Sequence, residues 1–156
     1  MVKIVTGKIN SEKTSRMIQL FEHTGVGDGY VSIKRMIRDK VHSYEAMRLQ
    51  TKTRMPLIVR DEYVWETFPV ACQIGPYLFN QDTLNQITRD IREMIERKIE
   101  PIYLDEIGLL ELEGKGFDHV VKDMVRSGRD VVLCVREDLL ERVLERYHVK
   151  DYEIVS

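Results

Sequence analysis

The chain has few of the residues that hold small proteins together by covalent or metal crosslinks. Its 156 residues include only two cysteines, Cys72 and Cys134, which lie far apart and form no CxxC pair. The four histidines are scattered and show no zinc-ligand spacing. A disulfide scaffold and a structural zinc site are therefore excluded, and the fold must depend on a hydrophobic core. Both cysteines and Trp65 are expected to pack in or near that core.

Long hydrophobic runs are also missing. The longest stretch without a charged residue, 67–81, contains two prolines and a glycine. It falls short of the roughly 18 apolar residues that a membrane-spanning helix needs. The first residues show no basic region followed by a hydrophobic one, as a signal peptide would. We therefore expect a cytoplasmic protein that does not enter a membrane, with reduced thiols.

Neither an excess of one charge nor a linker-like composition is present. The 24 Lys and Arg residues nearly balance the 26 Asp and Glu residues, and the formal net charge is −2. This balance provides no overall field to hold a long nucleic acid or an anionic membrane. Nine glycines and four prolines are too few to mark a linker, and no internal repeat is visible. Residues 1–156 are predicted to form a single domain.

The sequence does contain an alternation of short apolar runs with helical patterns. Runs typical of buried strands occupy residues 4–6, 102–104 and 131–135. Apolar residues at helical spacing occupy 13–23, 82–99, 117–127 and 139–147, and a last strand is expected at 152–155. A looser alternation over 29–60 indicates short strands in hairpins. Together these patterns predict an α/β fold with a mostly parallel sheet flanked by helices.

A phosphate-binding pattern lies between the first predicted strand and the first predicted helix. Residues 7–14, GKINSEKT, match GxxxxGK[ST] at every fixed position except the second glycine, which is Glu12. Such a loop surrounds phosphates with backbone N–H groups at a helix N-terminus. Its lysine, Lys13, would reach the outer phosphates, and its hydroxyl, Thr14, would bind Mg²⁺. The predicted nucleotide-binding residues are Gly7, Lys8, Ile9, Asn10, Ser11, Glu12, Lys13, Thr14 and Ser15.

Two adjacent acidic residues, Asp105 and Glu106, follow the second predicted strand. Ligands of parallel sheets bind outside the carboxyl ends of the strands, so the acidic pair and the loop should lie at one edge. Asp105 would then bind Mg²⁺, and Glu106 would act on the attacking water. Either motif alone could be an ordinary surface turn, but their combination favours a nucleotide site.

These motifs together resemble the small P-loop nucleoside-triphosphatases first described from thermophiles. The resemblance spans nearly the whole chain, and its most specific part is DEIGLLEL at 105–112, followed by Gly116-Phe117. It implies a three-layer, RecA-like P-loop NTPase fold with a hairpin insertion around residues 29–60. It also implies Mg²⁺-dependent hydrolysis of ATP, GTP and related nucleotides with broad base tolerance. By position, Lys13 would contact the β and γ phosphates, Thr14 and Asp105 would hold Mg²⁺, and Glu106 would be the general base.

Glu12 departs from the family's pattern. It adds bulk and a negative charge, and two like charges ~4 Å apart at an effective dielectric of ~20 repel by about 4 kcal/mol. Our hypothesis is that its carboxylate lies at the N-terminus of the first helix in the nucleotide-free protein, where it is favourable, and is displaced by phosphates. The alternative is a solvent-facing glutamate in a loop that no longer binds nucleotide.

Two basic features are open to more than one interpretation. Arg136 follows the strand 131–135 and could stabilise charge on the transferred phosphoryl group, although arginines after strands are commonly solvated. Residues 34–60 contain eight Lys and Arg residues against two acidic ones. This segment could line the nucleotide cleft or contact a phosphorylated second substrate or RNA. A solvated hairpin face is the more common explanation.

The sequence therefore predicts an enzyme, a phosphohydrolase that cleaves the γ-phosphate of ATP, GTP or related nucleotides with Mg²⁺. A nucleotide or small-molecule kinase is one alternative, because the same loop serves transfer to an acceptor other than water. A non-catalytic binding protein whose loop has decayed at Glu12 is another. Base preference and oligomeric state are left open by the sequence.

Overall fold

The computed structural model describes residues 1–9 and 11–155, so Asn10 of the predicted phosphate loop lies outside the described part. The strands are β1 Val2–Gly7, β2 Asp28–Ile37, β3 Lys40–Arg48, β4 Arg54–Arg60, β5 Val70–Ile74, β6 Tyr77–Asn80, β7 Ile102–Ile107, β8 Val131–Arg136 and β9 Tyr152–Val155. The α-helices are α1 Lys13–Thr24, α2 Gln81–Glu96, α3 Leu109–Leu112, α4 Asp118–Arg126 and α5 Leu140–Arg146. Two 3₁₀ turns are η1 Asp61–Tyr63 and η2 Glu137–Leu139.

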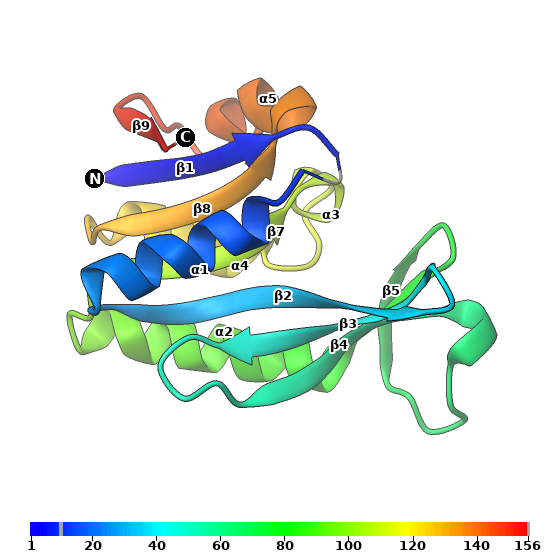
Figure 1. The fold of residues 1–156 in the computed structure, drawn as a ribbon. Helices are drawn as coiled ribbons and strands as arrows, with labels where there is room; N and C mark the ends of the chain where they lie inside the picture. Colours follow the sequence, from blue (N-terminus) through cyan, green and yellow to red (C-terminus); the bar gives the residue numbers. More distant parts are fainter. Residues whose placement is uncertain (10, 156) are drawn as a thin grey trace.

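The described strands form a nine-stranded sheet in the order β5-β6-β4-β3-β2-β7-β8-β1-β9 (Figure 1). Strands β2, β7, β8, β1 and β9 pair in parallel and make up the core of the sheet. The remaining strands extend it as an antiparallel half. The α/β architecture with a parallel core is confirmed. The hairpins expected at 29–60 are β2 to β4, and they continue the main sheet, which β6 and β5 lengthen further.

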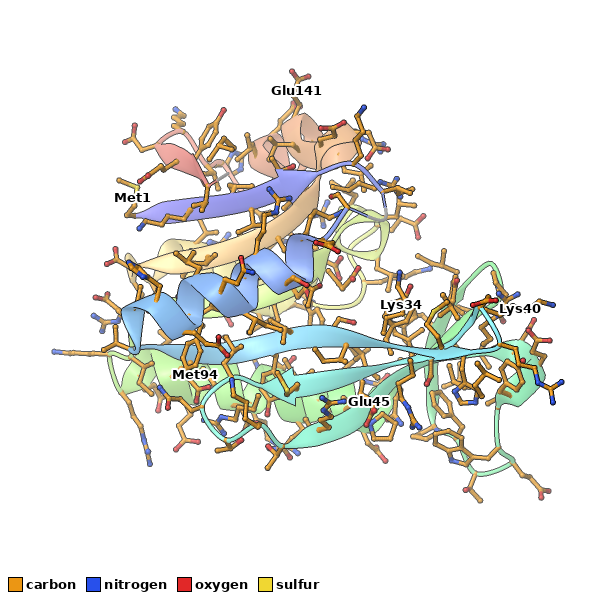
Figure 2. All side chains as sticks on the ribbon, viewed as in Figure 1. Met1, Lys34, Lys40, Glu45, Met94 and Glu141 are labelled. Carbon is orange, nitrogen blue, oxygen red and sulfur yellow. The ribbon has the colours of Figure 1, made fainter. Side chains whose placement is uncertain are left out.

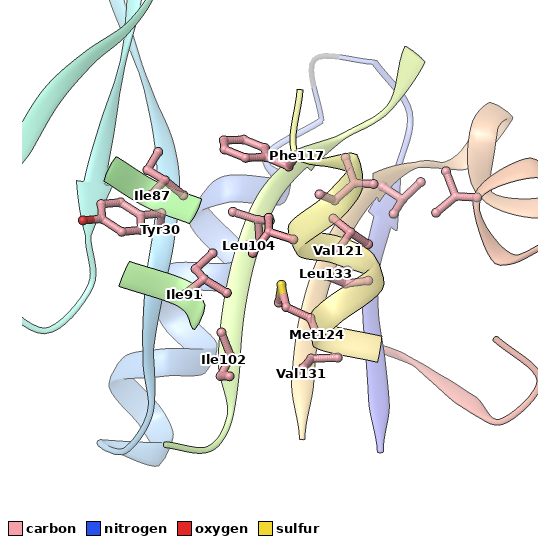
Figure 3. Close-up of a cluster of buried hydrophobic side chains, with 14 of the residues drawn as sticks. Tyr30, Ile87, Ile91, Ile102, Leu104, Phe117, Val121, Met124, Val131 and Leu133 are labelled. Atoms are coloured by element: carbon pink, nitrogen blue, oxygen red, sulfur yellow. The ribbon is translucent and has the colours of Figure 1, made fainter. Parts of the chain in front are cut away.

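Helices cover both faces of the parallel core, which explains its continuous apolar strands. In β8, Leu133 packs with α2 and α4 on one face, while Val132 and Cys134 pack with α1 on the other. Figure 3 shows the first of these clusters, in which Leu104 and Leu133 meet side chains of α2 and α4. Alternate residues of one strand thus enter two separate cores, as a sheet with both faces buried requires.

Helix α2 shows how local sequence sets the element boundaries. Its N-cap Asn80 accepts a hydrogen bond from the backbone N–H of Thr83 at 3.1 Å, as a capping asparagine should. Its buried stripe is Leu84, Ile87, Ile91 and Met94. The helix ends at Glu96, three residues earlier than the periodicity suggested, because Lys98 adopts a left-handed φ of 60° before Pro101.

The two cysteines and Trp65 were expected in or near the core, and the structure confirms this only in part. Cys134 is buried and Cys72 is half-buried. Trp65 was expected in or near the core, but it is 44% exposed in the loop between η1 and β5. It packs edge-on against the buried ring of Phe68, which anchors this loop in its place. No helix in the described ranges is long and apolar enough to cross a membrane.

A buried carboxylate joins α4 to the C-terminal helix. Asp118 accepts two hydrogen bonds from the Arg146 guanidinium, at 2.8 and 2.9 Å, and one from the Tyr147 hydroxyl at 2.8 Å. These bonds hold the pKa of Asp118 well below its usual range, despite the opposing effect of burial. Because the folded-state pKa is lowered, the carboxylate stabilises the fold above the unfolded-state pKa, near 3.9, and this contribution disappears as the pH falls through the folded value.

We predict that Asp118→Asn lowers the urea midpoint of unfolding at neutral pH, since the amide cannot accept the bidentate guanidinium. The gap from the wild type should be constant above about pH 5 and close as the pH falls below about 4. Equilibrium unfolding between pH 2.5 and 8 measures both. Asp151→Asn, at an exposed position, is the control. A gap that widens in acid would contradict this prediction.

Candidate active site

The phosphate loop, residues 7–14, and the acidic pair lie side by side. The loop leaves β1, the pair lies in β7, and β8 separates the two strands in the sheet. The hydroxyl of Thr14, on the first turn of α1, donates a hydrogen bond to Asp105 Oδ2 at 2.6 Å. This contact joins residues 91 positions apart in the chain. The expectation that both motifs meet in one site is therefore confirmed.

Asp105 is buried and held in place by the main chain. Its Oδ2 also accepts a hydrogen bond from the Ser32 N–H at 3.1 Å, and its Oδ1 accepts one from the Glu106 N–H at 2.8 Å. The neighbouring strand places Cys134 in the same cavity wall, where burial and the Asp105 charge raise the pKa of its thiol. The thiol therefore stays protonated and is a poor nucleophile.

A β-bulge at the acidic pair directs Glu106 into the site. Leu104 pairs with Leu133 and Ile107 with Val135, so Asp105 and Glu106 together oppose Cys134. Glu106 has a φ of 63°, a left-handed value that costs a side-chain-bearing residue about 1–3 kcal/mol. Bulges of this kind change the direction of side chains next to active sites. The two adjacent carboxylates thus occupy one site instead of opposite faces of the sheet.

The electrostatic setting of Glu106 is that of a group inside a cleft. The side chain is accessible to solvent but lies within the cavity, where protein atoms surround it. This desolvation and the nearby Asp105 charge raise the pKa of Glu106 to about 8, and the charges of Lys13 and Lys34 oppose the rise. In its ionised form, a carboxylate with a raised pKa is a stronger base than an ordinary surface glutamate.

The phosphate loop is folded back on itself. Lys13 Nζ donates to the carbonyl oxygen of Lys8 at 2.8 Å, and the Ser11 N–H donates to the same oxygen at 3.0 Å. A Cβ atom at Gly7 would lie 2.5 Å from Ser11 Oγ and 2.8 Å from an Arg16 guanidinium nitrogen, so both side chains would have to move to admit one. The lysine ammonium is thus held next to the position at which phosphates would enter.

Glu12 causes no backbone strain in this loop. It precedes α1 with a φ of −77°, which any residue can adopt, so its backbone does not need glycine in this structure. Its side chain is exposed, lines the cavity and makes no capping hydrogen bond to the helix. Glu12 therefore occupies the N-cap position of α1, but no hydrogen bond holds its carboxylate there, and the hypothesis that the helix N-terminus stabilises it stays a prediction.

Most of the predicted site residues line one cavity of about 690 Å³. From the loop and α1 these are Ile9, Ser11, Glu12, Lys13, Thr14 and Ser15, and from the strand ends Asp105, Glu106 and Arg136. Gly7 and Lys8 belong to the loop but not to the cavity wall. Arg136 is bound to Asp138 through its Nε atom. Sequence reasoning missed the contributions of Ser32 and Tyr44, which come from strands with no recognisable motif.

The basic segment 34–60 is divided among separate partners. Arg48 binds the buried Asp28, and Arg35 and Arg54 both lie near Glu45. Figure 2 shows Lys34 on the hairpin at the site and Lys40 out at the tip of the same hairpin. Lys34 lines the cavity. The segment therefore contributes one cation, Lys34, to the cavity wall, while Arg35, Arg48 and Arg54 lie beside acidic side chains.

The chain matches a known protein family in sequence and a solved structure in fold. A family model described as NTPase matches residues 3–156. The chain belongs to this NTPase family. A search of curated proteins finds no match. Among solved structures, the chain is similar to the solution structure of a human cancer-related nucleoside triphosphatase, with a TM-score of 0.65 and 19% identity over 98% of this chain and 86% of that one. At this identity the likeness supports the fold.

The string after the acidic pair in this NTPase folds into a clamp around Glu111. The Glu111 carboxylate is buried and accepts hydrogen bonds from the Gly108 N–H at 2.7 Å and the Phe117 N–H at 2.9 Å. Burial raises the pKa of Glu111 to about 7, against the lowering effect of these two bonds. The clamp closes the loop that carries α3 along one side of the cavity. Sequence reasoning gave Glu111 no role, although a lone acid within LLEL is a signal for a satisfied buried carboxylate.

Gly116 makes this clamp possible. It has a φ of 62°, and a Cβ there would lie 2.3 Å from Glu111 Oε2. The residue is therefore glycine for two reasons, its left-handed backbone and the carboxylate that passes against it.

We predict that Gly116→Ala destabilises the fold far more than Gly128→Ala. Gly128 has a similar φ of 73°, but a methyl group added there would meet nothing within 4 Å, so its replacement costs only the left-handed backbone, about 1–2 kcal/mol. Gly116→Ala adds the displacement of a buried carboxylate from its donors, a further 1–3 kcal/mol or so. Urea unfolding of both variants measures the difference. Equal losses would show that the clamp contributes nothing.

Proposed function

We propose that this NTPase hydrolyses the γ-phosphate of ATP, GTP and related nucleotides in a Mg²⁺-dependent reaction, giving the diphosphate and phosphate. The single observation that supports this most strongly is the 2.6 Å hydrogen bond between Thr14 and Asp105. It brings a hydroxyl and a carboxylate, both ligands that Mg²⁺ prefers, to the N-terminus of α1, where phosphates bind well. Membership of the NTPase family supports the same reaction class.

The residues around Asp105 suit a hydrated Mg²⁺ ion. Thr14 and Asp105 would hold it, and each is a hard oxygen donor. The nearby Ser32 Oγ is buried and has no hydrogen-bond partner among the described residues, so it is available to a water of the ion's shell. When bound, the ion would neutralise charge on the β and γ phosphates.

The remaining groups would each perform one task. Lys13 would leave the Lys8 carbonyl and bind the outer phosphates, because its ammonium is already at the loop. Glu106 would orient the attacking water and accept its proton. Lys34 lies near enough to affect the Glu106 pKa and would add positive charge beside the γ-phosphate. We propose a charge-stabilising role for Arg136 too, once it is released from Asp138.

Lys13→Ala and Glu106→Gln should each lower kcat for ATP at least about 100-fold, since they remove a phosphate-stabilising cation and a general base. Phosphate release with Mg²⁺ across ATP, GTP, CTP and UTP provides the measurement. Lys40→Ala and Glu113→Gln, at exposed positions outside the cavity, should retain wild-type rates. Activity that survives both site substitutions would refute the proposed roles.

Glu12→Gly should tighten the binding of Mg·ATP, because it removes a negative charge that faces the phosphates. A tenfold lower Kd, about 1.4 kcal/mol, is the expected minimum. Calorimetric titration measures it, and Glu12→Gln separates charge from bulk, since glutamine keeps the size of the side chain. Unchanged or weaker binding by Glu12→Gly would remove the idea that Glu12 opposes nucleotide.

A further inference from the structure

The cavity extends beyond the groups that hydrolysis uses. Its far side is made by aromatic and aliphatic side chains from β3, β4, β5 and β6, namely Tyr44, Ile58, Ile74, Tyr77 and Phe79. We call these five residues the aromatic wall. A volume of about 690 Å³ is in the range of sites that enclose a small organic molecule. Nothing in the proposed hydrolysis of ATP requires an apolar wall of this size.

The strand order decides which end of a nucleotide faces the aromatic wall. The phosphate loop follows β1, Glu106 lies on β7, and the strands of the wall come after β2 in the same direction across the sheet. The cavity thus runs from the loop, past Glu106, to the wall. Glu106 and Tyr44 of the wall line the same cavity. Burial, together with the Glu106 charge, raises the pKa of Tyr44 to about 12.

A nucleotide bound as proposed would turn its γ-phosphate toward Glu106, the group that faces the attacking oxygen. Its nucleoside is attached at the other end of the triphosphate, on the α-phosphate. The aromatic wall therefore lies on the side from which the γ-phosphorus is attacked, and the nucleoside of the bound triphosphate points away from it.

We propose that the aromatic wall is a second ligand site, which holds a neutral planar molecule bearing a hydroxyl group, of the nucleoside class, beside the γ-phosphate. This inference depends on the proposed function. The wall favours flat rings, since Tyr44 and Tyr77 already pack edge to face with centroids 6.1 Å apart. The five side chains of the wall are uncharged, and two opposite charges lie at its edge: Lys34, which pairs with Tyr44 across the hairpin, and the Glu106 carboxylate. A neutral acceptor therefore suits the wall.

A ligand in this site would take the place of water in the reaction. Its hydroxyl oxygen bonds to the γ-phosphorus while the bond from that phosphorus to the β–γ bridging oxygen breaks. The nucleoside diphosphate leaves with the electron pair of that bond, and the hydroxyl proton passes to the Glu106 carboxylate. The products are the phosphorylated acceptor and the diphosphate. Hydrolysis is then the reaction that occurs when the wall is empty.

The experiment uses five nucleosides as probes: adenosine, guanosine, cytidine, uridine and thymidine. Binding to the full chain saturated with Mg·ADP is followed by ligand-detected NMR, and ATP with each nucleoside is assayed for nucleoside monophosphate. We expect saturable binding of at least one nucleoside and formation of its monophosphate. Tyr77→Leu, with Phe79→Leu as a second variant, should weaken nucleoside binding at least about fivefold while ATP affinity is retained. Tyr63→Leu makes the same change outside the cavity and is the matched control.

Two results would overturn the inference. The first is that no nucleoside binds or is phosphorylated. The second is that Tyr77→Leu weakens ATP binding but not the binding of inorganic tripolyphosphate, which would place the base of the substrate itself on the wall. If phosphate is still released from ATP in either case, the proposed hydrolysis stands and only the second site fails. Absence of phosphate release with or without nucleosides would instead refute the proposed function, and nucleoside binding by the wall would still be measured directly.

Discussion

The hydrogen bond between Thr14 and Asp105 imposes a constraint that the rest of the fold must satisfy. It joins residues on either side of β8, and it depends on β1, β8 and β7 lying parallel with their ends level: Ile4, Leu133 and Leu104 pair in one row across the sheet. Parallel strands of this kind need crossover connections, and the helices in those connections cover both faces. The ends of β1, β8 and β7 thus lie together at the site only in a parallel sheet with helices on both faces. This arrangement accounts for the apolar strands, the two cores and the position of α1.

A local irregularity in β7 brings the two acidic side chains together at the site. A regular strand would turn Asp105 and Glu106 to opposite faces of the sheet, whereas the bulge opposite Cys134 and the left-handed backbone of Glu106 bring both toward the cavity. The loop that follows is then held by Glu111, whose two backbone donors come from either end of it. Residues 105–112 and the Gly116-Phe117 pair are therefore joined through Glu111 into one ordered loop directly after the acidic pair.

Much of this could be predicted from the sequence, and the failures have physical causes. Helices α1, α2, α4 and α5 and strands β1, β7 and β8 were predictable because burial on both faces leaves apolar runs, and burial on one face leaves a stripe such as that of α2. The one-turn helix α3 and the parallel pairing of β2 with β7 were not predicted. Strands β5 and β6 were missed because they are short and joined at Gly75-Pro76, so neither shows periodicity. Trp65 was misplaced because composition says nothing about the loop that carries it. Tyr44 and Ser32 reach the site only through sheet pairing, which no local pattern contains.

Glu12 illustrates how a departure from a motif can act on one step and leave another intact. Its backbone is relaxed and its carboxylate is exposed, so it harms neither the fold nor the position of Lys13. In the proposed complex its charge would face the phosphates in the bound substrate and in the transition state alike. An interaction that is equally unfavourable in both states raises KM and leaves kcat largely unchanged. Glutamate at position 12 is therefore compatible with a working catalytic site that needs a higher nucleotide concentration. The proposed roles of Asp105 and Glu106 are unaffected by it.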